Sequence, residues 1–294
     1  MIQRIVIVGT GLIGASIGLA LKAGQFSGEV LGWDASAAEL NEALRGGAID
    51  KALESRAAVL ATKADVYVLA TPVLPILDWM DALASVTGDG QLITDVGSTK
   101  GEITLLAETL FSGSGKAAFL PGHPMAGKES GGAALAEPSL FNGATWLFTP
   151  FGEESALELE WRDLVTGFGA VARDLDPVQH DEVCAWVSHL PQMLSTALAA
   201  LLQDAFSHDA EGMAAVQAIG GRGLRETTRL GSSPYSMWRD IAMTNTKPIT
   251  ETLLALEQRL AHLRENLRTP ELREEFATAN RFRSSKQASE SSIA

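Results

Sequence analysis

Apolar runs and amphipathic segments alternate through the first 176 residues of the chain. Short apolar runs predict strands at 5–8, 31–34, 65–70 and 91–95, with further strands expected at 118–120, 145–149 and 170–174. Apolar side chains at helical spacing fill much of the sequence between these runs, at 37–44, 73–86 and 153–168. Because strands that alternate with helices are typical of parallel sheets, we expect residues 1–176 to form a parallel α/β domain.

The pattern changes after Asp176 and Pro177. Strand signals almost disappear, and apolar residues recur at helical spacing in four segments, 178–206, 209–219, 234–245 and 247–268. We therefore expect an all-helical domain over residues 177–283. The final segment, 284–294, is rich in Ser, Gln and Glu, and it is expected to be a disordered tail because it has little to bury.

A glycine-rich turn follows the first apolar run and opens the first predicted helix. Gly9 allows a tight turn, Gly11 lets the backbone approach a pyrophosphate, and Gly14 lets the helix lie close to the sheet. Leu12 and Ile13 begin that helix, and its N-terminus would hold the pyrophosphate. The strand, turn and helix together predict a dinucleotide-binding, Rossmann-type βαβ unit.

Asp34 points to the kind of dinucleotide. It lies 20 residues beyond Gly14, at the end of the second apolar run. A carboxylate there can accept hydrogen bonds from both hydroxyls of the adenosine ribose, and it would repel the 2′-phosphate of NADP. NAD is therefore the expected cofactor. A glycine turn with a purely structural role is the alternative, and it does not account for the spacing to Asp34.

The composition is that of an ordinary globular protein. The chain has 294 residues, of which 46% are hydrophobic, and this is enough for two domains with a sizeable core. Cys184 is the only cysteine, so no intramolecular disulfide is possible, and no CxxC or Cys/His cluster in the sequence suggests a metal site. The N-terminal apolar run is too short for a signal peptide, and no run approaches a membrane span. We expect a cytoplasmic protein.

Charge is distributed unevenly along the chain. The formal net charge of −13 argues against a nucleic-acid partner, which needs a basic surface. Residues 222–247 nevertheless hold five basic side chains against two acids, a local excess of three positive charges. Such a segment suits a small anionic ligand, although a solvated helix face is the alternative for any single arginine.

Polar residues follow two of the predicted strands, at the sheet edge where α/β proteins bind their ligands. Thr71 and Pro72 follow one strand and Ser98 follows the next, so we expect all three to face the nicotinamide half of the cofactor. Ser98 is suited to bind a substrate hydroxyl. It is equally suited to cap a helix that begins at Thr99, with Glu102 completing part of the cap.

Histidines supply candidates for acid–base chemistry. His123 lies in residues 122–132, a predicted loop with glycine and proline on either side of the histidine, and it can accept a proton from a substrate hydroxyl. A surface or turn role is the alternative for this residue. His180 and His189 lie nine positions apart on the first long helix of the second half, so they do not share a helix face, and packing is the simplest role for His180.

The chain resembles the prephenate/arogenate dehydrogenase family of tyrosine biosynthesis. The resemblance rests on six segments in order: GxGLIGxS from Gly9, DVGSTK from Asp95, GHPMAGKESGG from Gly122, HDxVxAxVSHLP from His180, LRETTR from Leu224 and MWRDI from Met237. It implies a 6-phosphogluconate-dehydrogenase-like architecture with a helical domain that forms a homodimer. It also implies NAD-dependent oxidative decarboxylation of prephenate to 4-hydroxyphenylpyruvate, or of arogenate to tyrosine.

The resemblance also implies roles for individual residues. His123 would accept the hydroxyl proton, Ser98 would orient that hydroxyl, and Arg229 would clamp a substrate carboxylate. The remaining residues expected around the substrate, as a pocket wall or as polar contacts, are Trp238, His189, Glu129 and, more weakly, His180.

Gln192 departs from the family pattern, since many relatives that use prephenate carry a second histidine directly after HLP. A neutral amide there weakens the preference for the keto acid, so both substrates stay open, with prephenate ahead on family prevalence. From the length of the chain we expect neither a fused chorismate mutase domain nor an ACT domain.

Two rival interpretations remain. A β-hydroxyacid dehydrogenase would need a catalytic lysine on the first inter-domain helix, and residues 177–207 contain none. A non-catalytic NAD-binding module would have no need of Ser98, His123 and Arg229.

Overall fold

A six-stranded parallel sheet forms the centre of the N-terminal half. The computed structural model describes residues 1–128 and 130–291, and side chains up to residue 285. The sheet order is β3-β2-β1-β4-β5-β6, and the strands are β1 (Arg4–Val8), β2 (Glu29–Trp33), β3 (Lys51–Ala52), β4 (Val66–Leu69), β5 (Leu92–Asp95) and β6 (Ala118–Leu120). All the pairs are parallel, and the direction in which the strand order advances reverses between β1 and β4, which is where open α/β sheets bind ligands.

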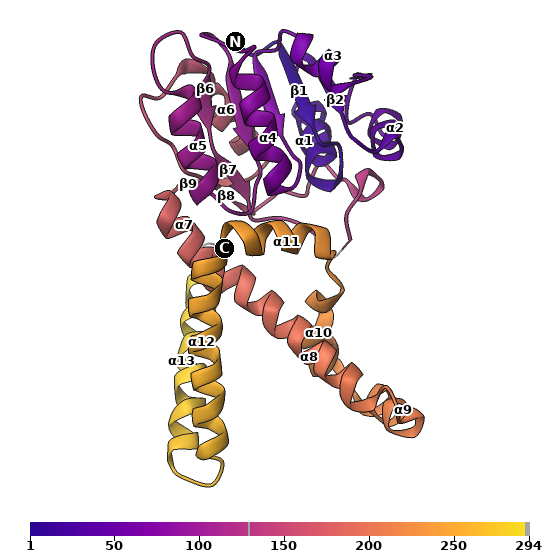
Figure 1. Ribbon diagram of the computed structural model, residues 1–294, viewed down its shortest axis with the longest axis vertical. Helices are drawn as coiled ribbons and strands as arrows, with labels where there is room; N and C mark the ends of the chain where they lie inside the picture. Colours follow the sequence, from indigo (N-terminus) through magenta and orange to yellow (C-terminus); the bar gives the residue numbers. More distant parts are fainter. Residues whose placement is uncertain (129, 292–294) are drawn as a thin grey trace. The chain divides into compact units, whose positions relative to one another are not determined.

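Helices cover both faces of this sheet (Figure 1). They are α1 (Leu12–Ala23), α2 (Ala37–Arg45), α3 (Arg56–Ala61), α4 (Val73–Ala84) and α5 (Gly101–Phe111). Alternate side chains of β1 enter two different cores, since Ile5 and Ile7 pack with α1 while Val6 and Val8 pack with α4 and α5. The expected parallel α/β domain is confirmed.

A second, three-stranded sheet carries the segment that contains His123. It has the order β7-β8-β9, with β7 (Gly122–Pro124) antiparallel to β8 (Thr145–Phe148), and β8 parallel to β9 (Val171–Asp174). Helix α6 (Ala156–Gly167) connects β8 to β9. The prediction that residues 122–132 are entirely loop is wrong for the first three, because the Gly–His–Pro triplet pairs with β8, a partner that local sequence does not reveal.

From Pro177 to Thr244 the chain is helical. It contains α7 (Pro177–Cys184), a π-helical turn (Ala185–His189), α8 (Leu190–Phe206), α9 (Ala210–Ile219), α10 (Arg222–Thr228), a 3₁₀ turn (Arg229–Ser232) and α11 (Tyr235–Thr244). The π turn lies just before Pro191, which has no N–H to continue the regular ladder and whose ring crowds the carbonyl four residues earlier. The expected change to helices after Asp176 is confirmed.

Residues 247–294 form a separate compact unit. Its helices are α12 (Thr246–Glu265) and α13 (Glu271–Ser291), with an ion pair between Arg259 and Glu275 at 2.6 Å. Helix α13 continues to Ser291, within the segment 284–294 for which the sequence predicts a disordered tail, and residues 292–294 lie outside the described residues. Ala, Gln, Glu and Lys in it are good helix formers even where little is buried.

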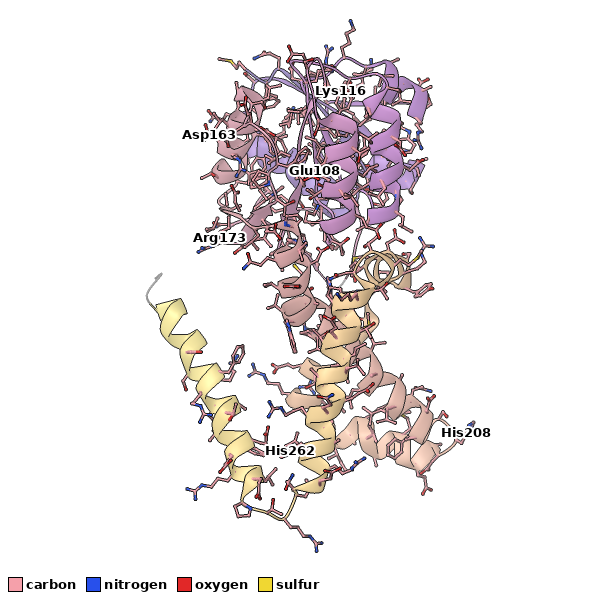
Figure 2. The ribbon with its side chains drawn as sticks, turned by 60° about the vertical axis from the view of Figure 1, so that its left-hand side comes forward. Glu108, Lys116, Asp163, Arg173, His208 and His262 are labelled. Carbon is pink, nitrogen blue, oxygen red and sulfur yellow. The ribbon has the colours of Figure 1, made fainter. Side chains whose placement is uncertain are left out.

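Charged side chains cover the surface of the sheet domain. Glu108, Lys116, Asp163 and Arg173 are exposed and stand on its outside (Figure 2). Among the described residues, no helix is both long enough and apolar enough to cross a bilayer.

Candidate active site

A cavity of about 600 Å³ lies at the carboxyl ends of the central strands. Its wall combines the start of α1, the residues after β4 and β5, strand β7, and the first turns of α11. Of the residues predicted to bind cofactor or substrate, the wall includes Leu12, Ile13, Thr71, Pro72, Ser98, His123 and Trp238. Segments far apart in the sequence therefore meet around one space.

The glycine-rich turn leaves space for a ligand backbone. Gly9 has a φ of +93°, and a Cβ there would lie 2.5 Å from the carbonyl oxygen of Ala70. A Cβ on Gly14 would lie 1.9 Å from the carbonyl oxygen of Gly9, so only glycine lets α1 pack this closely. Gly11 faces open space within 4 Å, and no side chain caps the helix that follows it. The uncapped N–H groups are free to bind an anion.

Asp34 lies just after β2, beside this turn. Its Oδ2 accepts a hydrogen bond from the Thr10 N–H at 2.7 Å, and its Oδ1 accepts one from the Ser36 N–H at 2.8 Å. These two bonds fix the carboxylate and leave it further lone pairs for ribose hydroxyls. The turn and the carboxylate therefore fit a dinucleotide.

His123 is held on β7 by a buried clamp on its neighbour, Gly122. The ammonium group of Lys100 donates to the Gly122 carbonyl at 2.7 Å, and Asp95 Oδ1 accepts from the Gly122 N–H at 3.1 Å. Lys100 and Asp95 also form an ion pair in which neither side chain is exposed. The backbone that presents the histidine is thus fixed on both sides by one pair of charges.

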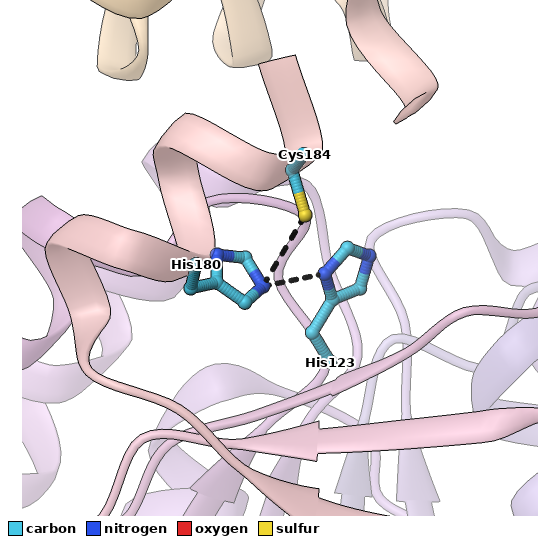
Figure 3. Close-up of side chains that lie close together, drawn as sticks. All are labelled: His123, His180 and Cys184. Atoms are coloured by element: carbon cyan, nitrogen blue, oxygen red, sulfur yellow. Dashed lines mark hydrogen bonds between the residues drawn. The ribbon is translucent and has the colours of Figure 1, made fainter. Parts of the chain in front are cut away.

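A chain of hydrogen bonds runs from His123 into the protein, and Figure 3 shows its first step, from His123 to His180. Nδ1 of His123 lies 2.9 Å from Nε2 of His180, and Nδ1 of His180 lies 2.8 Å from Oδ1 of Asp181. The Asp181 carboxylate also accepts the backbone N–H groups of Lys100 and Gly101, at 2.7 and 2.8 Å. The two oxygens of this side chain therefore act as acceptors for three N–H groups.

The carboxylate determines where the ring protons lie. Burial lowers the pKa of His123 well below its usual value, and burial also lowers the pKa of His180, so both rings are neutral near pH 7. Since Asp181 accepts, His180 carries its proton on Nδ1 and offers a lone pair on Nε2. His123 must then carry its proton on Nδ1, which leaves Nε2 as a base. That nitrogen is directed away from His180 (Figure 3).

Ser98 does not cap a helix. Helix α5 begins at Gly101 with Lys100 as its N-cap residue, and the side chain that satisfies its first N–H groups is the distant Asp181. The capping alternative for Ser98 is therefore wrong, because the helix starts two residues later than the sequence suggests. Ser98 instead lines the cavity with Thr71 and His123.

His189 and Trp238 form a wall beside the cavity. Their rings meet edge to face with centroids 5.7 Å apart. The Asn245 amide lies 3.1 Å from Nδ1 of His189, and burial lowers the pKa of His189 to about 4, so this ring is neutral. Nε1 of Trp238 is buried and has no hydrogen-bond partner among the described residues, although its ring lines the cavity. Unpaired buried donors are uncommon in native proteins, so this one calls for an explanation.

Gln192 is occupied within the protein. Its amide nitrogen donates to the Leu230 carbonyl at 2.7 Å and to Thr196, and its amide oxygen accepts from the Ser233 hydroxyl at 3.1 Å. The side chain therefore positions the turn after α10. It is outside the described cavity wall, and its contact with substrate stays a prediction.

Arg229 and Glu129 are the two other residues expected to contact the substrate. Arg229 is exposed at the start of the 3₁₀ turn, and it is also outside the described cavity wall. Its role as a carboxylate clamp stays a prediction. Glu129 lies outside the described residues.

The structure adds residues that the sequence did not single out. Asp181, Lys100 and Asp95 lie within segments that resemble the family, but their roles depend on contacts spanning 22–81 positions. The fold also brings Cys184 Sγ to 3.7 Å from His180 Nε2, so the expectation that the chain has no Cys/His cluster is wrong. Spacing along the chain could not reveal it, because His123 comes from a different sheet.

Two family models of prephenate dehydrogenases together match most of this chain. The family model described as prephenate dehydrogenase, nucleotide-binding domain, matches residues 17–173, and the one described as prephenate dehydrogenase, dimerization domain, matches residues 176–280. A prephenate dehydrogenase of Lactococcus lactis subsp. cremoris is 37% identical over 244 residues, covering 83% of this chain. The match spans 65% of that relative, slightly less than two thirds of its length.

Two solved structures are similar over nearly the whole chain. One is prephenate dehydrogenase from A. aeolicus in complex with hydroxyphenyl propionate and NAD+, with a TM-score of 0.83, 26% identity, and coverage of 100% of this chain and 99% of that one. The other is Synechocystis arogenate dehydrogenase, with a TM-score of 0.76, 28% identity, and coverage of 97% and 100%.

Proposed function

We propose, because this chain belongs to the prephenate dehydrogenase family, that it catalyses the NAD-dependent oxidative decarboxylation of prephenate to 4-hydroxyphenylpyruvate. In this reaction the hydroxyl-bearing ring carbon loses a hydride, the ring carboxylate leaves as carbon dioxide, and the ring becomes aromatic. The hydroxyl proton is held by a base and returns to the oxygen once the ring carries the electron pair of the broken C–C bond. The reaction as a whole therefore releases no net proton.

The cofactor site is assigned to the turn after β1 and to Asp34. NAD, when bound, supplies the hydride acceptor. The uncapped N-terminus of α1 and the open space at Gly11 support a pyrophosphate there. Asp34 is suited to bind a ribose whose 2′-hydroxyl is free, as in NAD. Thr71, Pro72 and Ser98 all line the cavity, and we assign them to the nicotinamide end of the cofactor.

His123 is the proposed proton acceptor, and the chain from Asp181 through His180 is the observation that carries the proposal. A ring fixed with its proton on Nδ1 is ready to accept at Nε2. As the proton arrives, the positive charge on His123 is stabilised through His180 by the fixed Asp181 carboxylate. His180 and Asp181 therefore act as positioning residues, and Ser98 orients the hydroxyl.

The substrate also carries carboxylate groups, and these need hydrogen-bond donors or positive charges from the protein. Trp238 lines the cavity, and its buried Nε1 has no hydrogen-bond partner among the described residues. Arg229 begins the turn that leads to Ser233, which lines the same cavity. We assign a substrate carboxylate to this side of the cavity, with Arg229 as the main clamp. His189, neutral and buried, supports the Trp238 ring rather than contributing charge.

Arogenate is the second candidate substrate, with tyrosine as its product. The observation in its favour is that the side chain of Gln192 is saturated by Leu230, Thr196 and Ser233. No imidazole follows Pro191 to hold the keto acid, so an ammonium group meets no cation at that position. The similarity to Synechocystis arogenate dehydrogenase supports the same alternative.

We propose a homodimer formed through the helical region. The family model for residues 176–280 is described as a dimerization domain. Large apolar side chains are exposed along α7, the π turn and α8, among them Val183, Trp186, Val187, Leu194 and Leu201. A row of exposed apolar residues is typical of a surface that a second copy covers.

The test is turnover with purified protein. The protein is incubated with NAD and either prephenate or arogenate, and the absorbance of the reduced cofactor is followed. Faster turnover of one compound identifies the substrate. Absence of turnover with both, in a protein that still binds NAD, would remove the proposed function.

A further inference from the structure

A buried cluster of three metal-ligand atoms lies behind the cavity wall. His123 Nδ1, His180 Nε2 and Cys184 Sγ all lie within 4.8 Å of one another (Figure 3). All three side chains are buried, and Cys184 is the only cysteine in the chain. The proposed proton transfer makes no use of the thiol, so the presence of a cysteine here is not explained by the reaction.

We propose that His123, His180 and Cys184 form an inhibitory site for a divalent metal ion of the zinc class. Two imidazole nitrogens and a thiolate are ligands that Zn²⁺ prefers, and three protein ligands leave one position open. Tetrahedral geometry with the usual bond lengths separates two nitrogens by about 3.3 Å, and nitrogen from sulfur by about 3.6 Å. The His180–Cys184 distance is 3.7 Å and the distance between the imidazole nitrogens is 2.9 Å, close to these values, and the third pair lies within 4.8 Å.

Asp181 supports this assignment independently. Metal-binding histidines usually donate their other N–H to a carboxylate, which fixes the ring and strengthens the ligand nitrogen. His180 has this arrangement, since its Nδ1 lies 2.8 Å from Asp181 Oδ1 while its Nε2 faces the cluster. One ligand is therefore already oriented before any ion arrives.

Metal binding would switch off the proposed base. A neutral imidazole keeps one ring proton, so an ion on Nδ1 of His123 moves that proton to Nε2. The nitrogen that faces the substrate then donates instead of accepting. The Cys184 thiol loses its proton to solvent, so each bound ion releases one proton. The expected loss of activity when the metal ion binds rests on the proposed function, whereas the binding of the ion does not.

The experiment separates binding from inhibition. Metal-free protein is titrated with Co²⁺, and a thiolate-to-cobalt charge-transfer band is expected, which only Cys184 can supply. Equilibrium dialysis with Zn²⁺ should give one tight site per chain, and the same ion should inhibit turnover. A thiolate band without any turnover would support the site while removing the proposed function. Absence of the band would overturn the site even in an active enzyme.

Two variants sharpen the result. Cys184→Ala should lose the cobalt band, retain turnover without metal, and need at least about tenfold more Zn²⁺ for half inhibition, the lower end of what losing even an outer-sphere partner costs. Cys184→Ser, closer in size, is the second variant if the alanine protein is unstable. His208→Ala is the control, since His208 is exposed at the end of α8 (Figure 2) and should not change the affinity. Equal Zn²⁺ sensitivity in the wild type and both Cys184 variants would overturn the proposal.

Discussion

Replacing Asp181 with Asn tests the proton chain most directly. The carboxylate accepts three hydrogen bonds, from His180 Nδ1 and from the N–H groups of Lys100 and Gly101. An amide has one accepting oxygen, so in either orientation its NH₂ group meets a donor. With the NH₂ group toward His180, both imidazole protons are reversed and Nε2 of His123 carries a hydrogen. The base is then no longer fixed in its active tautomer.

The size of the effect follows from this arrangement. A general base contributes about 10²–10⁴ in rate, and the corresponding change in a serine protease triad lowers kcat about 10⁴-fold. Because His180 lies between the carboxylate and the base here, we expect kcat to fall about 10²–10³-fold, or about 2.7–4.1 kcal/mol. The KM for NAD should change little, because Asp181 is outside the described cavity wall.

The same substitution also weakens the cap of α5, and a second variant separates the two effects. His180→Phe keeps a buried ring but breaks the chain to His123, and it leaves Asp181 bound to Lys100 and Gly101. Steady-state kinetics and thermal melting of both variants are the measurements. Both should lose kcat, while the loss of the α5 cap in Asp181→Asn costs an additional ~1 kcal/mol of stability. If Asp181→Asn lowers only the Tm and kcat stays within threefold, the proton-chain reasoning is refuted.

Four further predictions concern separate parts of the site. His123→Asn should keep the NAD dissociation constant and lower kcat by about 10²–10⁴; an unchanged kcat would remove His123 from the mechanism. Arg229→Ala should chiefly raise KM, by about 10- to 150-fold, because a carboxylate clamp acts equally in ground and transition states; a KM within twofold of wild type would make it a solvated charge. Because the Asp34 carboxylate would repel a 2′-phosphate, kcat/KM should be at least about tenfold higher with NAD than with NADP. Comparable values for the two cofactors would contradict this. Light scattering should give a dimer mass, and a monomer mass at all concentrations would exclude the proposed interface.

The sequence predicted the central sheet and the helical region because their signals are local. Residues 5–8 of β1 are all apolar and buried, and the spacing of Gly9, Gly11 and Gly14 sets the shape of the turn that follows. The structure has the tight turn and the close packing of α1 that this glycine spacing predicts. Such features need no information from distant residues.

The parts that sequence reasoning missed depend on long-range contacts. Strand β7 is three residues long and exists because β8, more than 20 positions later, pairs with it. The start of α5 is set by a carboxylate 80 positions away rather than by a local cap. His180 looked like a packing residue because its partner, His123, belongs to another sheet. Periodicity cannot reveal such contacts.

The clamp on Gly122 has a consequence for how this protein can evolve. Asp95 and Lys100 are fully buried and neutralise each other, so changing either one alone leaves an uncompensated charge in the interior, at a cost of about 3–5 kcal/mol. That is a large fraction of the whole stability of a typical domain. Substitutions at these two positions are therefore coupled. If the pair is replaced by two apolar residues one at a time, the single mutant in between is close to unfolding. Selection for folding alone is enough to keep the strand that carries His123 in place.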